Sequence, residues 1–172
     1  MSHNVEIKAK VKDLNKVRAK VFEIADQGPI TIDQEDTFYK CQNGLLKLRK
    51  FSNAEGELIY YERENKGGPR SCHYLISRIS EPRKIEEILS NALAVRGTVK
   101  KRRILYTVGQ TRIHFDDVHG LGEFVEFEYV LSAGQSEVEG IQHIESLMER
   151  LGISKGDLID RSYVDILLGI TV

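Results

Sequence analysis

The sequence has few of the features that mark secreted, membrane or redox proteins. Its 172 residues include only two cysteines, Cys41 and Cys72, and they follow no metal-binding spacing. Two free thiols are the simpler expectation, because two cysteines form one disulfide at most. No apolar run approaches the roughly 20 residues of a membrane-spanning helix, and the N-terminal residues lack the apolar centre of a signal peptide. We therefore expect a cytoplasmic protein with no membrane partner.

The chain also lacks an excess of either charge. Lysine and arginine number 25 and aspartate and glutamate 26, which gives a formal net charge of −1. Nucleic-acid binders generally depend on excess positive charge, so we expect no nucleic-acid partner. The basic run at residues 100–103 does not change this, because strand alternation divides it between two faces. Any anion site must therefore come from local segregation of charge.

What is present suffices for one folded domain. Apolar residues make up 41% and charged residues 30% of the chain, and a chain of this length buries roughly two thirds of its unfolded surface. No linker, repeat or low-complexity tract interrupts it, so residues 1–172 are expected to form a single domain. The sequence leaves open whether the protein is a monomer or a homodimer.

Two-residue periodicity predicts most of the strands. Residues 4–11 alternate between polar and apolar side chains. Further strands are expected at residues 30–41, 45–49, 58–64, 72–79, 101–108, 111–118 and 121–129. Asn43-Gly44 is a strong hairpin turn, and short turns at residues 109–110 and 119–120 join the last three strands. The count is about eight.

Helical periodicity predicts the remaining elements. Asp13 is the expected N-cap of a helix that ends at Gly28-Pro29, and Pro82 begins a second helix that ends before Gly97. Residues 135–151 form a third, amphipathic helix, and a short fourth is expected near residues 157–168. The helices need apolar surfaces to cover, and only the strands offer large ones.

If helices cover the apolar strand faces, the charged faces look either into solvent or into the lumen of a closed barrel. Basic residues collect on these faces: Lys8, Lys10, Lys47, Arg49, Arg63, Lys101, Arg103 and Arg112. Carboxylates share them: Glu6, Asp116, Glu126 and Glu128. So many confined charges favour a polyanion and a divalent metal as neutralising partners. Arginine and lysine suit phosphate, and carboxylates suit Mg²⁺ or Mn²⁺.

Five short motifs, in order, resemble the CYTH or triphosphate-tunnel metalloenzyme superfamily. This group includes class IV adenylyl cyclases, thiamine-triphosphatases and inorganic triphosphatases. Residues 4–8 resemble its Glu-x-Glu-x-Lys, residues 101–103 its Lys-x-Arg, and residues 105–109 the Ile/Leu-Tyr-x-x-Gly that follows. Arg112 and Asp116 resemble its Arg-x-x-x-Asp, and residues 120–128 its Gly-Leu-Gly-x-Phe-x-Glu-x-Glu. Ser162-Tyr163 is typical of the cyclase-like branch. Each motif is weak alone, but their order over nearly the whole chain is specific.

The resemblance implies an α+β fold: a closed antiparallel β-barrel of about eight strands that forms a triphosphate tunnel, with amphipathic helices packed outside. It implies Mg²⁺ or Mn²⁺ held by Glu6, Asp116, Glu126 and Glu128. A triphosphate-containing small molecule is the implied partner, gripped by Lys8, Lys47, Arg49, Arg63, Lys101, Arg103 and Arg112. Lys10 joins this set from its position on the same strand face. Glu6, Lys8 and Glu126 are the expected catalytic residues.

One position departs from the pattern, because Asn4 stands where the family has its first glutamate. An amide oxygen can ligate Mg²⁺, but it carries no charge and cannot act as a base. The departure therefore either weakens the metal site or abolishes turnover. His114, beside Asp116 on the charged face, can contact phosphate, assist proton transfer or simply hold the carboxylate.

The leading hypothesis is a metal-dependent phosphohydrolase acting on inorganic or organic triphosphate. The first alternative is a class IV adenylyl cyclase that converts ATP to cyclic AMP and pyrophosphate. Hydrolysis needs no purine pocket, and none is recognisable in the sequence. The second alternative is a non-catalytic triphosphate- or polyphosphate-binding protein. The third alternative is a sheet-and-helix interaction module, which is expected if the charged strand faces lie in solvent.

Overall fold

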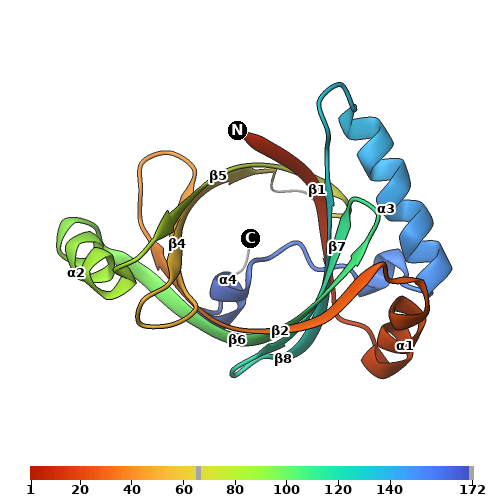
Figure 1. The fold of residues 1–172 in the computed structure, drawn as a ribbon, viewed down its shortest axis with the longest axis horizontal. Helices are drawn as coiled ribbons and strands as arrows, with labels where there is room; N and C mark the ends of the chain where they lie inside the picture. The colour runs from red at the N-terminus through yellow and green to blue at the C-terminus, as the bar shows by residue number, and fades with distance from the viewer. Residues whose placement is uncertain (65–66, 171–172) are drawn as a thin grey trace.

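The computed structural model describes residues 1–64 and 67–170. Eight antiparallel strands close into a barrel in the order β1-β5-β4-β3-β2-β6-β7-β8. Looking along the barrel, α1, α2 and α3 lie outside the ring, whereas α4 lies within its outline (Figure 1). The closed antiparallel barrel of about eight strands with helices packed outside is therefore confirmed.

The strands are β1 (Ser2–Ala9), β2 (Gln27–Tyr39), β3 (Leu45–Lys50), β4 (Gly56–Arg63), β5 (Arg70–Ile79), β6 (Val95–Val108), β7 (Thr111–Val118) and β8 (Gly122–Val130). The α-helices in the described part of the chain are α1 (Leu14–Ile24), α2 (Pro82–Ala92), α3 (Glu137–Leu151) and α4 (Tyr163–Leu167). A short 3₁₀ helix, η1 (Lys155–Asp157), precedes α4.

The main hydrophobic core lies on the outer surface of the barrel. Val5 and Ile7 of β1 and Phe127 of β8 are completely buried, as are Val21 of α1 and Ile144 of α3. These side chains alternate with polar ones along each strand, so covering the apolar face with helices turns the polar face toward the lumen. The charged strand faces thus point inward, and the interaction module with exposed charged faces is not what the chain forms.

Side chains cap the starts of α1 and α3, and the first of these caps, Asp13, was predicted. The Asp13 side chain accepts a hydrogen bond from the Lys16 backbone N–H at 2.9 Å. Ser136 and Glu139 form a reciprocal capping box at the start of α3. Both arrangements satisfy backbone donors that the first helical turn leaves without partners.

Helix ends differ from the sequence prediction at both glycine signals. Helix α1 ends at Ile24, and Gly28 lies inside β2, where a Cβ atom would sit 2.5 Å from the Leu105 carbonyl oxygen. Helix α2 ends at Ala92, and Gly97 lies inside β6, where a Cβ atom would sit 2.9 Å from Val164 of α4. Close packing explains both glycines. Because Gly97 belongs to a strand and not to a helix end, β6 starts at Val95, earlier than predicted.

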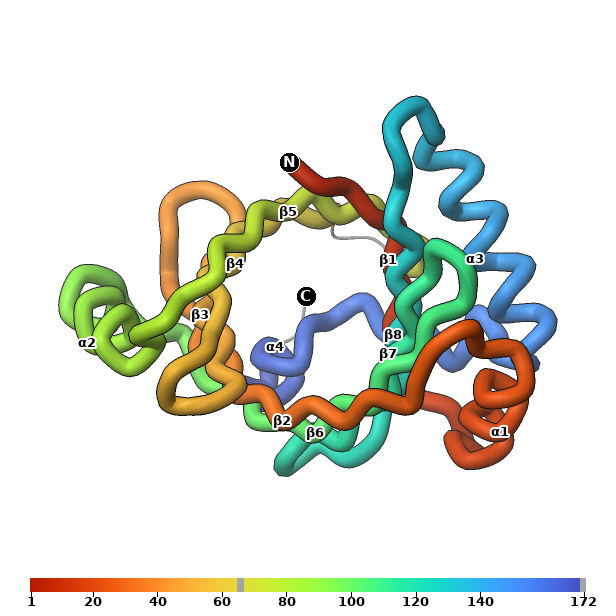
Figure 2. Tube along the Cα trace, viewed as in Figure 1, coloured from red at the N-terminus to blue at the C-terminus, as the bar shows by residue number. Residues whose placement is uncertain are grey.

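The segment before α4 is irregular instead of helical. The Ile159 N–H donates to the Lys8 carbonyl, and the Lys10 N–H donates to the Asp157 carbonyl. The end of β1 thereby holds residues 157–159 in a non-helical path, and the chain then crosses beneath the lumen toward α4 (Figure 2). The predicted helix near residues 157–168 is thus replaced by η1, a crossing segment and the short α4.

Two further expectations concern cysteines and membranes. Cys41 and Cys72 are both free thiols, as predicted. None of the helices in the described residues is long and apolar enough to span a bilayer.

Candidate active site

A cavity of about 370 Å³ occupies the barrel lumen. Seven basic residues line it: Lys8, Lys47, Arg49, Arg63, Lys101, Arg103 and Arg112. Five carboxylates line it as well: Glu6, Asp36, Glu57, Glu126 and Glu128. The excess of cations, in walls that are largely buried, makes the lumen a site for an anion.

A larger hollow of about 820 Å³ lies among other charged residues. Its lysines and arginines are mostly paired with carboxylates: Lys50 and Lys100 both contact Glu35, and Arg102 contacts Asp33 at 2.9 Å. Because these charges satisfy one another, the hollow offers no comparable anion site.

The lumen brings together all but two of the residues predicted from the sequence. Lys10 lies outside it: the side chain is exposed, reaches the Leu121 carbonyl at 3.3 Å and sits over the Phe124 ring. Strand β1 ends at Ala9, so the alternation that faces Lys8 inward does not extend to Lys10. The prediction that Lys10 binds substrate is not matched by its position.

Asp116 is the second exception, because its side chain is completely buried behind the cavity wall. One carboxylate oxygen accepts from Arg103 Nε at 2.6 Å. The other accepts from Arg103 Nη2 at 2.6 Å, Lys101 Nζ at 3.1 Å and the Tyr163 hydroxyl at 3.1 Å. The predicted metal-ligand role requires an accessible oxygen, and here all the contacts are with donors. The position is instead that of a counter-ion.

Asp36 on β2 forms a matching counter-ion that the sequence prediction missed. It accepts from Arg49 Nε at 2.7 Å, Arg49 Nη2 at 2.8 Å and Lys47 Nζ at 3.1 Å. Burial alone would raise the pKa of Asp36, but the charges of Arg49 and Lys47 hold it well below its usual range. The carboxylate therefore stays ionised and fixes both cations at the cavity wall.

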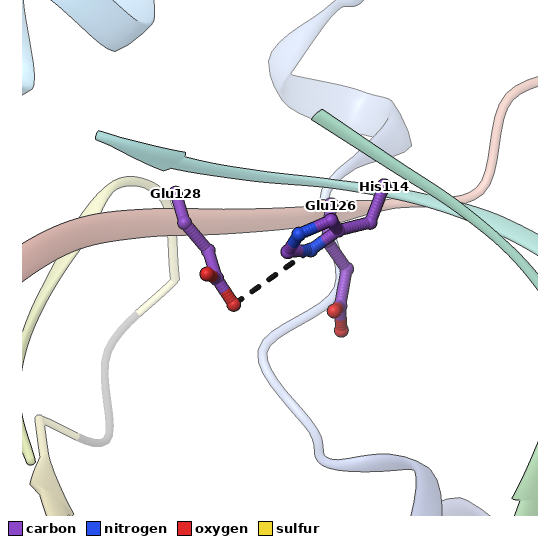
Figure 3. A group of neighbouring side chains, drawn as sticks. All are labelled: His114, Glu126 and Glu128. Carbon is purple, nitrogen blue, oxygen red and sulfur yellow. Dashed lines mark ion pairs between the residues drawn. The ribbon is translucent and has the colours of Figure 1, made fainter. Parts of the chain in front are cut away.

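Glu126 and Glu128 on β8 and His114 on β7 form the described cluster best suited to a metal (Figure 3). One donor atom from each lies within 4.8 Å of the others. Oxygen donors beside one imidazole suit Mg²⁺ or, better, Mn²⁺. Burial and the charge of Arg103 lower the pKa of His114 to about 4, so the ring is neutral and has a free lone pair near pH 7. The residues present therefore fit a divalent metal.

The same carboxylates already hold cations. Glu126 contacts Lys8 Nζ at 3.2 Å and Arg103 Nη2 at 2.6 Å. Glu128 contacts Arg112 Nη2 at 2.9 Å. Burial would raise the pKa of Glu126, but the charges of Lys8 and Lys101 hold it well below its usual range. A metal and a phosphate chain entering together can exchange partners with these pairs without leaving a buried charge unpaired.

Glu6, the third predicted ligand, lies on β1 beside this cluster. Its carboxylate accepts from Arg70 Nε at 3.0 Å and lies 3.9 Å from Arg63 Nη1. Arg70 is 2% exposed and also donates to the Asp160 carbonyl at 2.6 Å. Nothing in the local sequence singles out Arg70, because only the pairing of β1 with β5 places it opposite Glu6.

Tyr163 of α4 contributes to the wall at one end of the lumen. Its hydroxyl bonds Asp116, and Lys8 Nζ lies 3.9 Å from the centre of its ring. Lys8 also donates to the Arg161 carbonyl at 3.3 Å. The C-terminal segment thus fixes both a predicted phosphate-binding lysine and the counter-ion of Arg103.

Comparisons with known proteins support this description. The model of a family described as the CYTH domain matches residues 2–163. A Methanocaldococcus jannaschii protein named "Putative adenylate cyclase" is 27% identical, over 94% of this chain and 97% of its own length.

Solved structures agree in fold. A Pyrococcus horikoshii protein has a TM-score of 0.83 at 24% identity, covering 94% of this chain and 98% of its own. A Hippeastrum protein, whose description reports a dominant triphosphatase activity, has a TM-score of 0.71 at 13% identity over 100% of this chain and 98% of its own. At these identities the structures show a shared barrel fold.

Proposed function

Because the chain belongs to the CYTH family, we propose that it is a metal-dependent enzyme acting on a triphosphate held in the barrel lumen, with hydrolysis as the reaction. The observation that carries the proposal is the enclosed cavity in which seven cations face five carboxylates. A triphosphate is compact and highly charged, and a divalent metal offsets its remaining charge.

The basic side chains divide into two wall groups. Lys47 and Arg49 are fixed by Asp36, and Lys101 and Arg103 are fixed by Asp116. Because each pair is held in place before substrate arrives, binding costs little side-chain ordering. Lys8, Arg63 and Arg112 complete the phosphate contacts. Rigid cations around an extended phosphate chain stabilise the charge that develops as a phosphoryl group is transferred.

Glu126 and Glu128, with His114 or Glu6, would hold the metal. A bound Mg²⁺ or Mn²⁺ polarises phosphoryl oxygens and lowers the pKa of a coordinated water. Lys8 contacts Glu126 and lies in a wall fixed by Tyr163, so it would hold a phosphate oxygen beside the metal. These assignments keep Glu6, Lys8 and Glu126 as the proposed catalytic residues and replace Asp116 by His114 in the proposed metal site.

Formation of cyclic AMP from ATP is the second candidate, favoured by the name of the archaeal relative. Both reactions use one metal-phosphate site and differ in the attacking group, which is water or the ribose 3′-hydroxyl. Product analysis separates them. The protein is incubated with inorganic triphosphate, thiamine triphosphate and ATP, each with Mg²⁺ or Mn²⁺, and orthophosphate, pyrophosphate and cyclic AMP are measured.

Metal-dependent orthophosphate release supports the hydrolase, and cyclic AMP with pyrophosphate supports the cyclase. Tight triphosphate binding with no product supports a non-catalytic sensor, in which Asn4 is the lesion. The Asn4→Glu variant then becomes informative. If the position faces the metal, the added carboxylate raises metal affinity and turnover; an unchanged metal affinity shows that it does not. Absence of any triphosphate binding rejects all three functions.

A further inference from the structure

Lys8 shares its carboxylate partner with the proposed metal. The ammonium is buried, and among the described residues its one ion pair is with Glu126, at 3.2 Å. A divalent ion that binds Glu126 displaces the ammonium from this carboxylate, because its double charge attracts the oxygens more strongly than a single charge does. Lys8 must nevertheless stay in place to hold a phosphate oxygen. Metal binding therefore leaves this lysine in need of another partner inside the protein.

The face of the Tyr163 ring is suited to that role. Lys8 Nζ lies 3.9 Å and Lys101 Nζ 5.1 Å from the centre of the ring. Both distances are within the range over which an aromatic face attracts a cation, and the attraction is greatest where water is excluded. Here Lys8 is 5% and Tyr163 6% exposed. A ring face is also uncharged, so it retains the ammonium without repelling phosphate, as a second carboxylate would.

The ring is held in place by contacts that involve neither metal nor substrate. Its hydroxyl donates to Asp116 on β7 at 3.1 Å, and its centre lies 5.0 Å from that of the Phe124 ring on β8. The next residue, Val164, is 1% exposed and fills the space beside Gly97 on β6. Three strands thus fix the start of α4, which lies within the outline of the barrel (Figure 1). The ring is in position before any ligand arrives.

We propose that Tyr163 is a positioning residue that keeps Lys8 in place when a metal occupies Glu126. In the empty site, Glu126 and the ring share the ammonium. In the loaded site, the ring and the Arg161 carbonyl, which lies 3.3 Å from Nζ, retain it beside the phosphate. The inference rests on the proposed function. It adds that the start of α4 belongs to the phosphate site and that its contribution depends on the metal.

The test measures binding of bis-methylene triphosphate, an analogue of inorganic triphosphate that cannot be hydrolysed, by calorimetry with saturating Mn²⁺ and without metal. Tyr163→Leu removes the ring and should raise the dissociation constant about tenfold with Mn²⁺ but no more than about twofold without it, because Glu126 then still holds Lys8. Tyr163→Phe keeps the ring face and loses only the hydroxyl. It should bind within about twofold of the wild type in both conditions.

Two further variants separate positioning from a general loosening of the fold. Val164→Ala weakens the packing of α4 on β6 without touching Lys8, so it should lower the melting temperature and leave the dissociation constants unchanged. Lys8→Met removes the cation, and adding Tyr163→Leu to it should change the dissociation constant with Mn²⁺ by less than about twofold. A ring with a purely structural role would cause the same loss with or without Lys8.

The inference is overturned if Tyr163→Leu binds like the wild type, or if its loss is equal with and without Mn²⁺. It is also overturned if Tyr163→Phe or Val164→Ala shows the same metal-dependent loss, or if the loss persists in the Lys8→Met protein. A wild type that binds neither the analogue nor inorganic triphosphate rejects the proposed function, and the inference with it. A wild type that binds both, beside an unaffected Tyr163→Leu variant, rejects the inference alone.

Discussion

At the scale of single residues, the lumen carboxylates are of two kinds. Asp36 and Asp116 are almost fully buried and bond only to cations and a tyrosine. Glu126 and Glu128 border the open cavity and keep a donor atom near His114. The first kind positions basic side chains, whereas the second is available to a metal. Substitutions of the two kinds therefore have different expected consequences.

Glu126→Gln tests the metal-binding kind. The amide keeps the shape but loses the charge that a divalent ion requires, so metal-dependent turnover should fall at least about 100-fold, which is close to 3 kcal/mol. Turnover is measured against Mn²⁺ concentration, with thermal denaturation as a check on folding. Glu123→Gln, at an exposed position of the same strand, is the control and should be unaffected. Full activity of the Glu126 variant would exclude its metal role.

Asp116→Asn tests the counter-ion kind. Removing one charge from a buried group of ions leaves Lys101 and Arg103 without a full partner, at a cost of about 3 kcal/mol. The melting temperature of the metal-free protein should fall by about 6–12 °C. Asp117→Asn is the control at the next, exposed position, and it should melt like the wild type. If Asp116→Asn instead preserves stability and weakens metal binding, the original metal-ligand prediction is restored.

Lys47 should make triphosphate binding sensitive to pH. Burial and the neighbouring Arg49 charge lower the pKa of Lys47 to about 8. Below that pH the free protein already carries the charge that binds phosphate. Above it, binding must take up a proton, so affinity should fall by up to tenfold per pH unit.

Calorimetric dissociation constants between pH 7.5 and 9.5 measure this effect without metal. Lys47→Arg keeps a charge that does not titrate in this range, and its profile should be flatter than the wild-type profile. Identical slopes in the two proteins would show that Lys47 does not titrate on binding.

At the scale of elements, the sequence predicts strand faces well and strand ends poorly. Alternation placed Lys8 and Glu126 correctly in the lumen. It could not show that β1 ends before Lys10, because that end is set by pairing with residues 157–159. It also could not show that Lys101 and Tyr163 bond to Asp116 and cover it, whereas Glu126 borders the cavity.

Long-range pairing explains the residues that the sequence did not reveal. Arg70 reaches the lumen carboxylate Glu6 only because β5 pairs with β1 and brings the two residues opposite each other. Asp36 is an exception, because alternate residues of β2 face the same side and Gln34, Asp36 and Phe38 all line the lumen. The two-residue alternation of this strand could therefore have predicted the position of Asp36. Glycine was misread as a helix stop at Gly28 and Gly97, where close packing against Leu105 and Val164 accounts for it.

Helix α3 offers a test of an element by itself. Its capping box joins Ser136 and Glu139, with the Glu139 backbone N–H donating to the Ser136 hydroxyl at 3.3 Å. Ser136→Ala should lower the free energy of unfolding by about 1 kcal/mol, because a backbone donor of the first turn loses its partner. Ser146→Ala, at an exposed position in the middle of the same helix, should be neutral or slightly stabilising. Chemical denaturation measures both, and equal effects would show that the box contributes nothing.

At the scale of the whole molecule, the chain is nearly neutral. Closure of the barrel nevertheless concentrates seven of its basic side chains around one cavity. A ligand that neutralises them should stabilise the fold in proportion to its affinity, by about 2.7 kcal/mol at 100 times its dissociation constant. For a domain of this size that corresponds to roughly 5–10 °C in melting temperature.

The decisive comparison is between triphosphate and simple anions at equal ionic strength. Inorganic triphosphate should raise the melting temperature progressively with concentration, because one molecule spans cations on several strands and so ties the barrel together. Orthophosphate and sulfate reach fewer of them and should have a much smaller effect. Arg49→Met removes one wall cation and should shrink the triphosphate shift, whereas Arg102→Met, on the outer face beside Asp33, should not. Equal stabilisation by sulfate would mean that general screening, and not an enclosed site, is responsible.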